Sequence, residues 1–233
     1  MPARTNQNDA EVVVLESKGS GRSAILNAGA SLQDVHQASG IPDLLASTLG
    51  GSLSWQSRNE NTVLRVMQSP TLAPRFVAAL LALGVRVLSG DDEEEPLADY
   101  LERTEARDVP ASAIRIPIEV PGRAWGEAHV SRTPADQPIV AAVAVLDLTS
   151  GEVRQARLAL AGTWRGPVGL AGSVESLVGG PLDEKRISEV AEAVGREVEP
   201  RSDYRGSADY RRALAAVLAR RSLEDCWKGV ERS

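Results

Sequence analysis

Few side chains in this sequence are suited to acid–base, nucleophilic or metal chemistry. The 233 residues include two histidines, His36 and His129, and one cysteine, Cys226. One thiol can neither close an internal disulfide nor hold a metal cluster, and two histidines are too few for a histidine-based zinc or iron site. Cys226 lies in a charged C-terminal segment with no histidine nearby, and no G-x-S-x-G elbow is present. The sequence therefore predicts no catalytic residue and no metal site.

A glycine-rich passage near the start superficially matches the dinucleotide-binding fingerprint. Gly19-Ser-Gly21 follows a strand-like run, and Ala24 occupies the last place of the pattern. The fingerprint requires a helix next, because the phosphate binds at the N-terminus of that helix. Residues 24–27, Ala-Ile-Leu-Asn, are typical of a strand instead. We therefore interpret the passage as a hairpin turn.

Composition and charge restrict the classes of function. The net charge of −6 argues against general nucleic-acid binding, which needs a basic face. The acidic run from Asp91 to Glu95 is more typical of a solvated loop than of a metal site. No run of roughly 18 apolar residues is present, and the polar start does not resemble a signal peptide. We expect a cytoplasmic protein without membrane contact.

Hydrophobic periodicity and turn residues predict a disordered tail at residues 1–10 and two units, 11–108 and 109–233. In the first unit, Ser31 is suited to cap a helix, and Gly50-Gly51 are suited to end another. The expected strands are 11–15, 23–28 and 85–88, and the expected helices are 32–38, 41–50, 75–83 and 97–103.

The second unit is expected to begin after a linker at Val109-Pro110 with three strands, 113–120, 139–148 and 153–161. The strand from Ile139 is apolar on both faces and should lie centrally beneath covering helices. Pro117 suggests that the strand before it lies at an edge. A largely antiparallel sheet of three or four strands is predicted.

Three helices should complete the second unit. Ser173 is suited to cap a short one, and the residues after Pro181 and Ser207 show apolar positions at helical spacing. We expect the last two helices, 183–196 and 207–222, to pack on one face of the sheet. Strands followed by packed helices predict an α+β fold.

Three stretches of the chain carry a family resemblance. Residues 26–35 are similar to "I-G-A-x-T-x-L-x-D/E-I", and residues 41–62 are similar to "P-x-L-x-x-A … I-R-N-x-G-T-I-G-G". The third runs through 156–162 and 177–180 to 203–212, where Asp203-Tyr-Arg-Gly-Ser-Ala-Asp-Tyr-Arg-Arg resembles "D-x-R-x-S-x-x-Y-R". Together they resemble the FAD-binding medium subunit of molybdenum hydroxylases, the carbon monoxide dehydrogenase and xanthine dehydrogenase group. The resemblance implies a truncated FAD-binding-type α/β subdomain followed by an antiparallel sheet with packed helices.

The resemblance also implies FAD as the cofactor. The residues that it assigns to cofactor binding are Arg58, Asn59, Thr62 and Arg65. In the family, glycines in this loop bring the backbone close to the cofactor. Here Asn61 replaces the first glycine, and Leu64-Arg65 replace the closing pair.

A second cofactor loop of the family, "A-G-G-T-D-L", has no equivalent in residues 1–25. We therefore interpret the chain as an N-terminally shortened member. Because a diphosphate needs several converging N–H donors, we expect the isolated chain to bind FAD weakly or not at all.

The function implied by the resemblance is that of an oxidoreductase subunit of the molybdopterin dehydrogenase family. Such a subunit passes electrons from iron–sulfur clusters via FAD to an acceptor, and its partners are a molybdenum-cofactor large subunit and an iron–sulfur small subunit. The alternative is a cofactor-free structural or regulatory interaction protein derived from that family. Trp125 and Trp164 are candidate interface anchors, although each also suits a core. The sequence does not identify the substrate, the acceptor or the oligomeric state.

Overall fold

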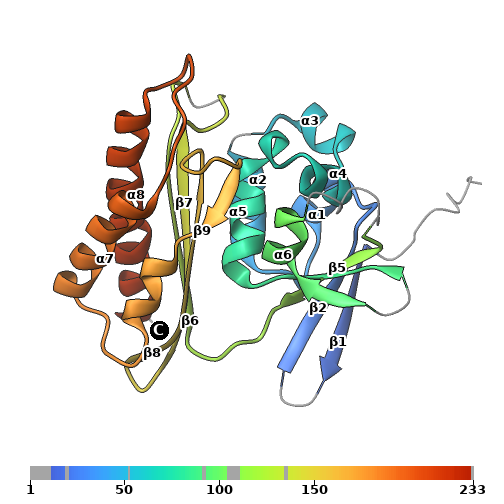
Figure 1. Cartoon of the computed structure of the whole chain (residues 1–233). Helices are drawn as coiled ribbons and strands as arrows, with labels where there is room; N and C mark the ends of the chain where they lie inside the picture. The colour runs from blue at the N-terminus through green and yellow to red at the C-terminus, as the bar shows by residue number, and fades with distance from the viewer. Residues whose placement is uncertain are drawn as a thin grey trace, which may run out of the picture.

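The computed structural model describes residues 12–18, 21–51, 53–90, 93–103, 111–133 and 136–231. The expected tail at 1–10 and the expected linker at Val109-Pro110 lie outside these residues. The described residues form two antiparallel sheets with helices between and beside them (Figure 1). The predicted α+β fold is confirmed.

The first sheet has the strand order β1-β2-β5-β3-β4, and all its pairs are antiparallel. β1 and β2 pair antiparallel up to Lys18 and Gly21, and the residues from Gly21 to Asn27 form a strand rather than the helix that the dinucleotide fingerprint requires. The strands are β1 (Val13–Lys18), β2 (Gly21–Asn27), β3 (Arg86–Leu88), β4 (Glu94–Pro96) and β5 (Ala113–Pro117).

Two expectations about this sheet were wrong. β5 was expected to open the second unit. Instead it lies between β2 and β3 in the first sheet and pairs with both. Its alternating pattern shows that one face is buried, but it cannot show which sheet the strand joins. The end of the acidic run is a strand rather than a loop: β4 pairs with β3, and Glu94 and Glu95 form ion pairs with arginines.

Six α-helices of the described chain belong to the first unit. Ser31 caps α1, as expected, with its Oγ accepting from the backbone N of Asp34 at 3.0 Å. Neither α3 nor α4 was expected, because that passage was interpreted as a loop. The helices are α1 (Leu32–Gln37), α2 (Asp43–Gly50), α3 (Trp55–Glu60), α4 (Val63–Gln68), α5 (Pro74–Leu83) and α6 (Leu97–Glu102), with the short 3₁₀ helix η1 (Pro70–Leu72) before α5.

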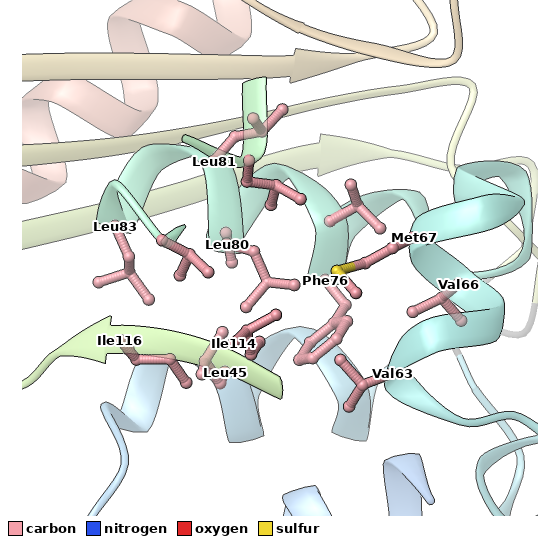
Figure 2. Packing of buried hydrophobic residues seen from close by; sticks show 14 of the residues in the cluster. Leu45, Val63, Val66, Met67, Phe76, Leu80, Leu81, Leu83, Ile114 and Ile116 are labelled. Atoms are coloured by element: carbon pink, nitrogen blue, oxygen red, sulfur yellow. The ribbon is translucent and has the colours of Figure 1, made fainter. Parts of the chain in front are cut away.

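α5 is the centre of the molecule. Every residue from Arg75 to Leu83 is buried, as expected for a helix that is covered on all sides. Phe76 and Leu80 lie above β5 of the first sheet, while Leu81 points toward the second sheet (Figure 2). The helix ends at Gly84, which adopts the left-handed conformation (φ 71°) that glycine accepts without strain.

The second sheet has the order β6-β7-β8-β9, and all its pairs are antiparallel, as predicted. β7 is buried on both faces: Val143 and Val145 pack with the core around α5, and Ala142 and Ala144 pack with the core on the opposite face. The sequence had predicted β7 and β8 but not β6 or β9. The strands are β6 (Arg123–Val130), β7 (Val140–Thr149), β8 (Glu152–Ala161) and β9 (Val168–Leu170).

α7 (Glu184–Glu197) and α8 (Ala208–Glu231) cover the face of this sheet that is remote from α5 (Figure 1). This confirms the predicted packing of the last two helices. α8 crosses β6 so closely that a Cβ atom on Gly126 would overlap the carbonyl oxygen of Ser222. The short element expected near Ser173 is a 3₁₀ helix, η3 (Gly172–Leu177), and Ser173 does not cap it.

Candidate cofactor site

The four predicted cofactor residues lie in one corner of the first unit, formed by α3 and α4. Arg58 lies in α3 and holds the neighbouring elements together. Its Nε donates to Gln33 Oε1 at 2.8 Å, and its Nη1 donates to the carbonyls of Leu53 at 2.6 Å and Leu49 at 3.3 Å. The guanidinium therefore joins α1, the end of α2 and α3, which is a structural role.

The side chains of the other three predicted residues differ in the hydrogen bonds that they make. Asn59 donates from Nδ2 to the carbonyl of Trp55 at 2.7 Å, one turn earlier in α3. Thr62 caps α4, with its Oγ1 accepting from the backbone N of Arg65 at 3.2 Å. The exposed Arg65 side chain makes no hydrogen bond or ion pair with the described residues. Of the four, Arg65 is the one whose side chain has no such contact.

The N–H groups at the start of α4 are the donors that a phosphate would need. Val63 N donates to the carbonyl of Ala30 at 3.0 Å, and Leu64 N donates to the carbonyl of Ala28 at 2.7 Å. The next two N–H groups are bonded to Thr62, one to its Oγ1 and one to its carbonyl. A helix N-terminus binds anions through N–H groups that lack a partner within the protein, and here the first turn has partners throughout.

In the loop of residues 27–32, which faces the start of α4, the backbone N–H groups are also bonded within the chain. Asn27 accepts from the backbone N of Gly29 through its side chain at 2.8 Å and from the backbone N of Ala30 through its carbonyl at 3.1 Å. Leu32 N donates to the carbonyl of Asn61 at 2.9 Å. The two loops therefore cap one another, and their N–H groups are not available to the diphosphate of FAD. Cofactor contact by Arg58, Asn59, Thr62 and Arg65 stays a prediction without support from this geometry.

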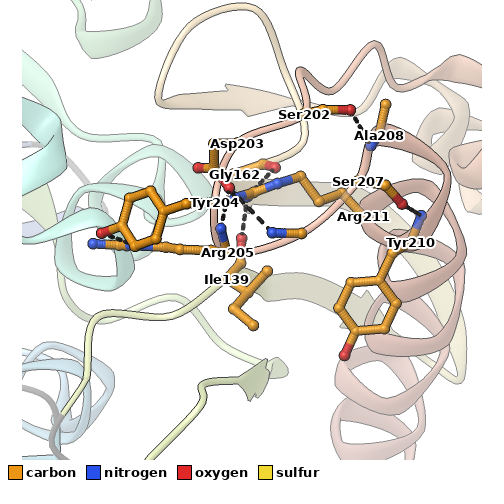
Figure 3. A network of polar contacts seen from close by, with 11 residues as sticks. Ile139, Gly162, Ser202, Asp203, Tyr204, Arg205, Ser207, Ala208, Tyr210 and Arg211 are labelled. Atoms are coloured by element: carbon orange, nitrogen blue, oxygen red, sulfur yellow. Dashed lines mark hydrogen bonds and ion pairs between the residues drawn. The ribbon is translucent and has the colours of Figure 1, made fainter.

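The passage that resembles "D-x-R-x-S-x-x-Y-R" forms a second polar centre (Figure 3). Arg211 is 5% exposed, and its Nη1 donates to the carbonyls of Ile139 at 2.6 Å and Gly162 at 3.0 Å. Its Nη2 donates to Asp203 Oδ1 at 2.6 Å, which also accepts from the backbone N of Arg205 at 2.8 Å. Burial opposes ionisation of Asp203, but these hydrogen bonds outweigh it and lower the pKa of the carboxyl.

Ser207 completes this centre by capping α8, as expected, with its Oγ accepting from the backbone N of Tyr210 at 3.2 Å. Arg211 thus ties together the β6–β7, β8–β9 and α7–α8 connections. The motif holds the shape of one end of the second unit.

A buried ion pair joins the two units. Arg75 of α5 and Glu127 of β6 are 5% and 7% exposed in their side chains, and Ser47 Oγ also donates to Glu127 at 3.3 Å. His129 Nδ1 lies 3.7 Å from the same carboxylate. Burial and the charge of Arg75 lower the pKa of His129, against the opposing influence of Glu127.

A cavity of 950 Å³ also lies at the junction of the units, between the end of α4, α6 and the β8–β9 connection. None of the four predicted cofactor residues lines it. Trp164 does, and it packs partly buried against the core of the second unit, so it is not the exposed anchor that was considered. Trp125 is 38% exposed, which agrees better with the expectation of an interface anchor.

The described part of the chain lacks both a metal-binding cluster and a membrane-spanning helix. It holds no group of three or more His, Cys, Asp or Glu side chains placed to bind a metal ion. None of its helices is both long enough and apolar enough to span a bilayer. Cys226 is buried, and burial raises the pKa of its thiol.

Comparison with known sequences places residues 128–226 in the CO dehydrogenase flavoprotein C-terminal domain family. The carbon monoxide dehydrogenase medium chain of Afipia carboxidovorans is 30% identical over 113 residues, 48% of this chain and 39% of that one. The corresponding chain of Hydrogenophaga pseudoflava is 26% identical over 131 residues, 56% and 45% of the two chains. A glyceraldehyde dehydrogenase medium chain of Sulfolobus acidocaldarius is 24% identical over 177 residues, 73% and 63%. The match thus spans less than half the length of the two carbon monoxide dehydrogenase chains.

Solved structures share the fold over nearly all of this chain. Carbon monoxide dehydrogenase from Hydrogenophaga pseudoflava lacking the Mo-pyranopterin moiety aligns with a TM-score of 0.79 at 22% identity, covering 93% of this chain and 78% of that chain. Quinoline 2-oxidoreductase from Pseudomonas putida 86 aligns with a TM-score of 0.76 at 21% identity, with the same coverage. The chain is therefore similar in sequence and fold to the medium chains of carbon monoxide dehydrogenases, and its residues 128–226 match the CO dehydrogenase flavoprotein C-terminal domain.

Proposed function

We propose that the chain works as the medium-subunit component of a molybdenum hydroxylase. The observation that carries this proposal is the fold, which matches carbon monoxide dehydrogenase over 93% of the chain and includes the flavoprotein C-terminal domain. By resemblance, its partners are a molybdenum-cofactor large subunit and an iron–sulfur small subunit. In such an assembly the medium subunit belongs to the path that carries electrons to an acceptor.

The turn that carries the predicted cofactor residues does not offer free N–H groups to a flavin diphosphate. FAD supplies the redox chemistry of intact medium subunits, but the N–H donors at the start of α4 are already bonded within the chain. We therefore expect the isolated protein to retain little FAD. The absorption spectrum of protein that was incubated with FAD and then dialysed measures this directly, and a stoichiometric yellow flavoprotein would contradict the expectation.

One observation favours a second function, that of a cofactor-free interaction subunit. The mutual capping of residues 27–32 and 61–66 makes a stable turn that has no need of a ligand. The comparisons favour the first function, since the named relatives are medium chains of oxidoreductases. Flavin content of the complete assembly separates the two: an assembly with iron and molybdenum but without flavin supports the interaction subunit.

The proposed function is tested by co-expressing this chain with the candidate large and small subunits of its host. Only the small subunit is tagged, and the eluate is analysed by size exclusion and mass spectrometry. We expect this chain to co-elute with both subunits at a constant ratio, and a culture without the tagged subunit is the control for column binding. Recovery of this chain only as a free monomer would contradict the proposal.

A further inference from the structure

The connection between α7 and α8 presents the exposed Tyr204 and the half-buried Arg205 in a fixed arrangement. Tyr204 is 80% exposed, the largest exposure among the exposed large hydrophobic residues described. The guanidinium carbon of Arg205 lies 5.4 Å from the centre of the Tyr204 ring, and its Nε donates to the Tyr204 hydroxyl at 3.0 Å. A cation–π contact and a hydrogen bond thus hold the two side chains against each other (Figure 3).

Hydrogen bonds of Asp203 fix the backbone of the loop that carries Tyr204 and Arg205. Asp203 accepts from the backbone N of Arg205 at 2.8 Å and of Gly206 at 3.2 Å, and it is itself bonded to the buried Arg211. Burying a guanidinium requires several good acceptors, and three oxygens supply them here. Since the loop needs no further ordering, a partner that binds it loses little conformational entropy.

Three arginines at this end of the molecule have no acidic partner among the described residues. They are Arg201 and Arg205 in the loop and Arg132 in the β6–β7 connection, which Arg211 ties to the loop. The nearby carboxylates of Glu199 and Asp203 are already paired with other arginines. Asp136, in the same connection as Arg132, also lies at this end and among the described residues accepts only from the backbone N of Thr133, so the arginines without an acidic partner outnumber it here.

These features match the chemistry of a protein interface. Tyrosine and arginine are enriched among the residues that dominate binding energy, and guanidinium groups bind carboxylates in a bidentate manner. We propose that Arg132, Arg201, Tyr204 and Arg205 form a docking surface for an acidic patch on a partner subunit of the assembly. This inference rests on the proposed function and names the surface through which this chain is held.

The test uses the complete complex, assembled from co-expressed subunits, and measures the dissociation constant of this chain. Tyr204→Ala and Arg205→Glu are each expected to raise that constant by about tenfold or more, as hot-spot residues do. Arg221→Glu is the matched control, because Arg221 is exposed on α8, well past the loop, and has no acidic partner among the described residues. We expect the control to bind like the wild type.

Salt dependence gives a second readout. Raising the salt from about 50 mM to about 200 mM should weaken the wild type more than Arg205→Glu, since screening removes an attraction that the variant lacks. A wild-type complex that neither Tyr204→Ala nor Arg205→Glu weakens would overturn the docking surface and leave the proposed function intact. Failure of the wild type to assemble would overturn both. Far-ultraviolet circular dichroism of each variant confirms that the fold is retained.

Discussion

Replacing Glu127 by glutamine should strongly destabilise the protein, because it leaves the charge of Arg75 buried without a counter-ion. The two side chains are only 5% and 7% exposed, and the carboxylate is the one hydrogen-bond acceptor recorded for this guanidinium among the described residues. Removing one partner of a buried ion pair costs roughly 3–5 kcal/mol. Because native domains are stable by about 5–15 kcal/mol, the loss is a large share of the total.

Urea unfolding, followed by circular dichroism, measures this effect through the free energy of unfolding. The matched control is Glu152→Gln, whose pair with Arg154 is exposed at 57% and 50%, so its loss should cost less than about 1 kcal/mol. The double variant Arg75→Met with Glu127→Leu should recover most of the stability, since no buried charge remains. The reasoning is refuted if Glu127→Gln costs no more than the control.

Three further predictions concern the second unit. The pKa of His129 should lie below its ordinary value of 6.5, because burial and the charge of Arg75 oppose its protonation. The stability that this group contributes above pH 6.5 should therefore be lost as the pH falls through the folded-state pKa. Nuclear magnetic resonance titration and unfolding at several pH values would measure the two effects. Cys226 should resist thiol reagents in the native protein and react in urea, because burial raises the pKa of its thiol, and rapid labelling of the native protein would be inconsistent with that placement. Gly126→Ala should cost roughly 1–3 kcal/mol by pushing α8 away from β6 at Ser222, and an unchanged melting temperature would speak against this close approach.

The features that could be predicted from sequence are those set by local chemistry. Ser31 and Ser207 cap helices because a hydroxyl ahead of an apolar helical stripe satisfies a free N–H group. β7 could be placed at the centre of its sheet because an uninterrupted apolar run needs cover on both faces. The resemblance of the C-terminal half rests on such local strings and agrees with the matched family domain.

The features that could not be predicted depend on long-range pairing. β5 shows an alternating pattern that suits either sheet, and its partners β2 and β3 are distant in sequence. In the candidate site, the sequence showed which glycines had been replaced near Asn61 and Leu64, but not what the N–H groups bond to instead. Their acceptors at Ala28 and Ala30 lie more than thirty residues earlier in the chain, and only the folded structure brings them together.

The buried Arg75–Glu127 pair was missed for the same reason. Its two members are 52 residues apart, and nothing in the sequence around either one distinguishes it from a surface charge. Trp164 was considered as an exposed anchor because tryptophan content alone does not separate a core residue from an interface residue. Its partial burial depends on the position of the β8–β9 connection.

Membership of a molybdenum hydroxylase assembly is tested most directly by the metal content of the native complex. The chain is tagged at its genomic locus, the complex is purified by two successive columns, and molybdenum, iron and flavin are quantified across the eluted peak. The proposed function predicts that molybdenum and iron co-elute with this chain in a constant ratio. Elution of the chain in fractions that contain neither metal, with the metals recovered elsewhere, would contradict it.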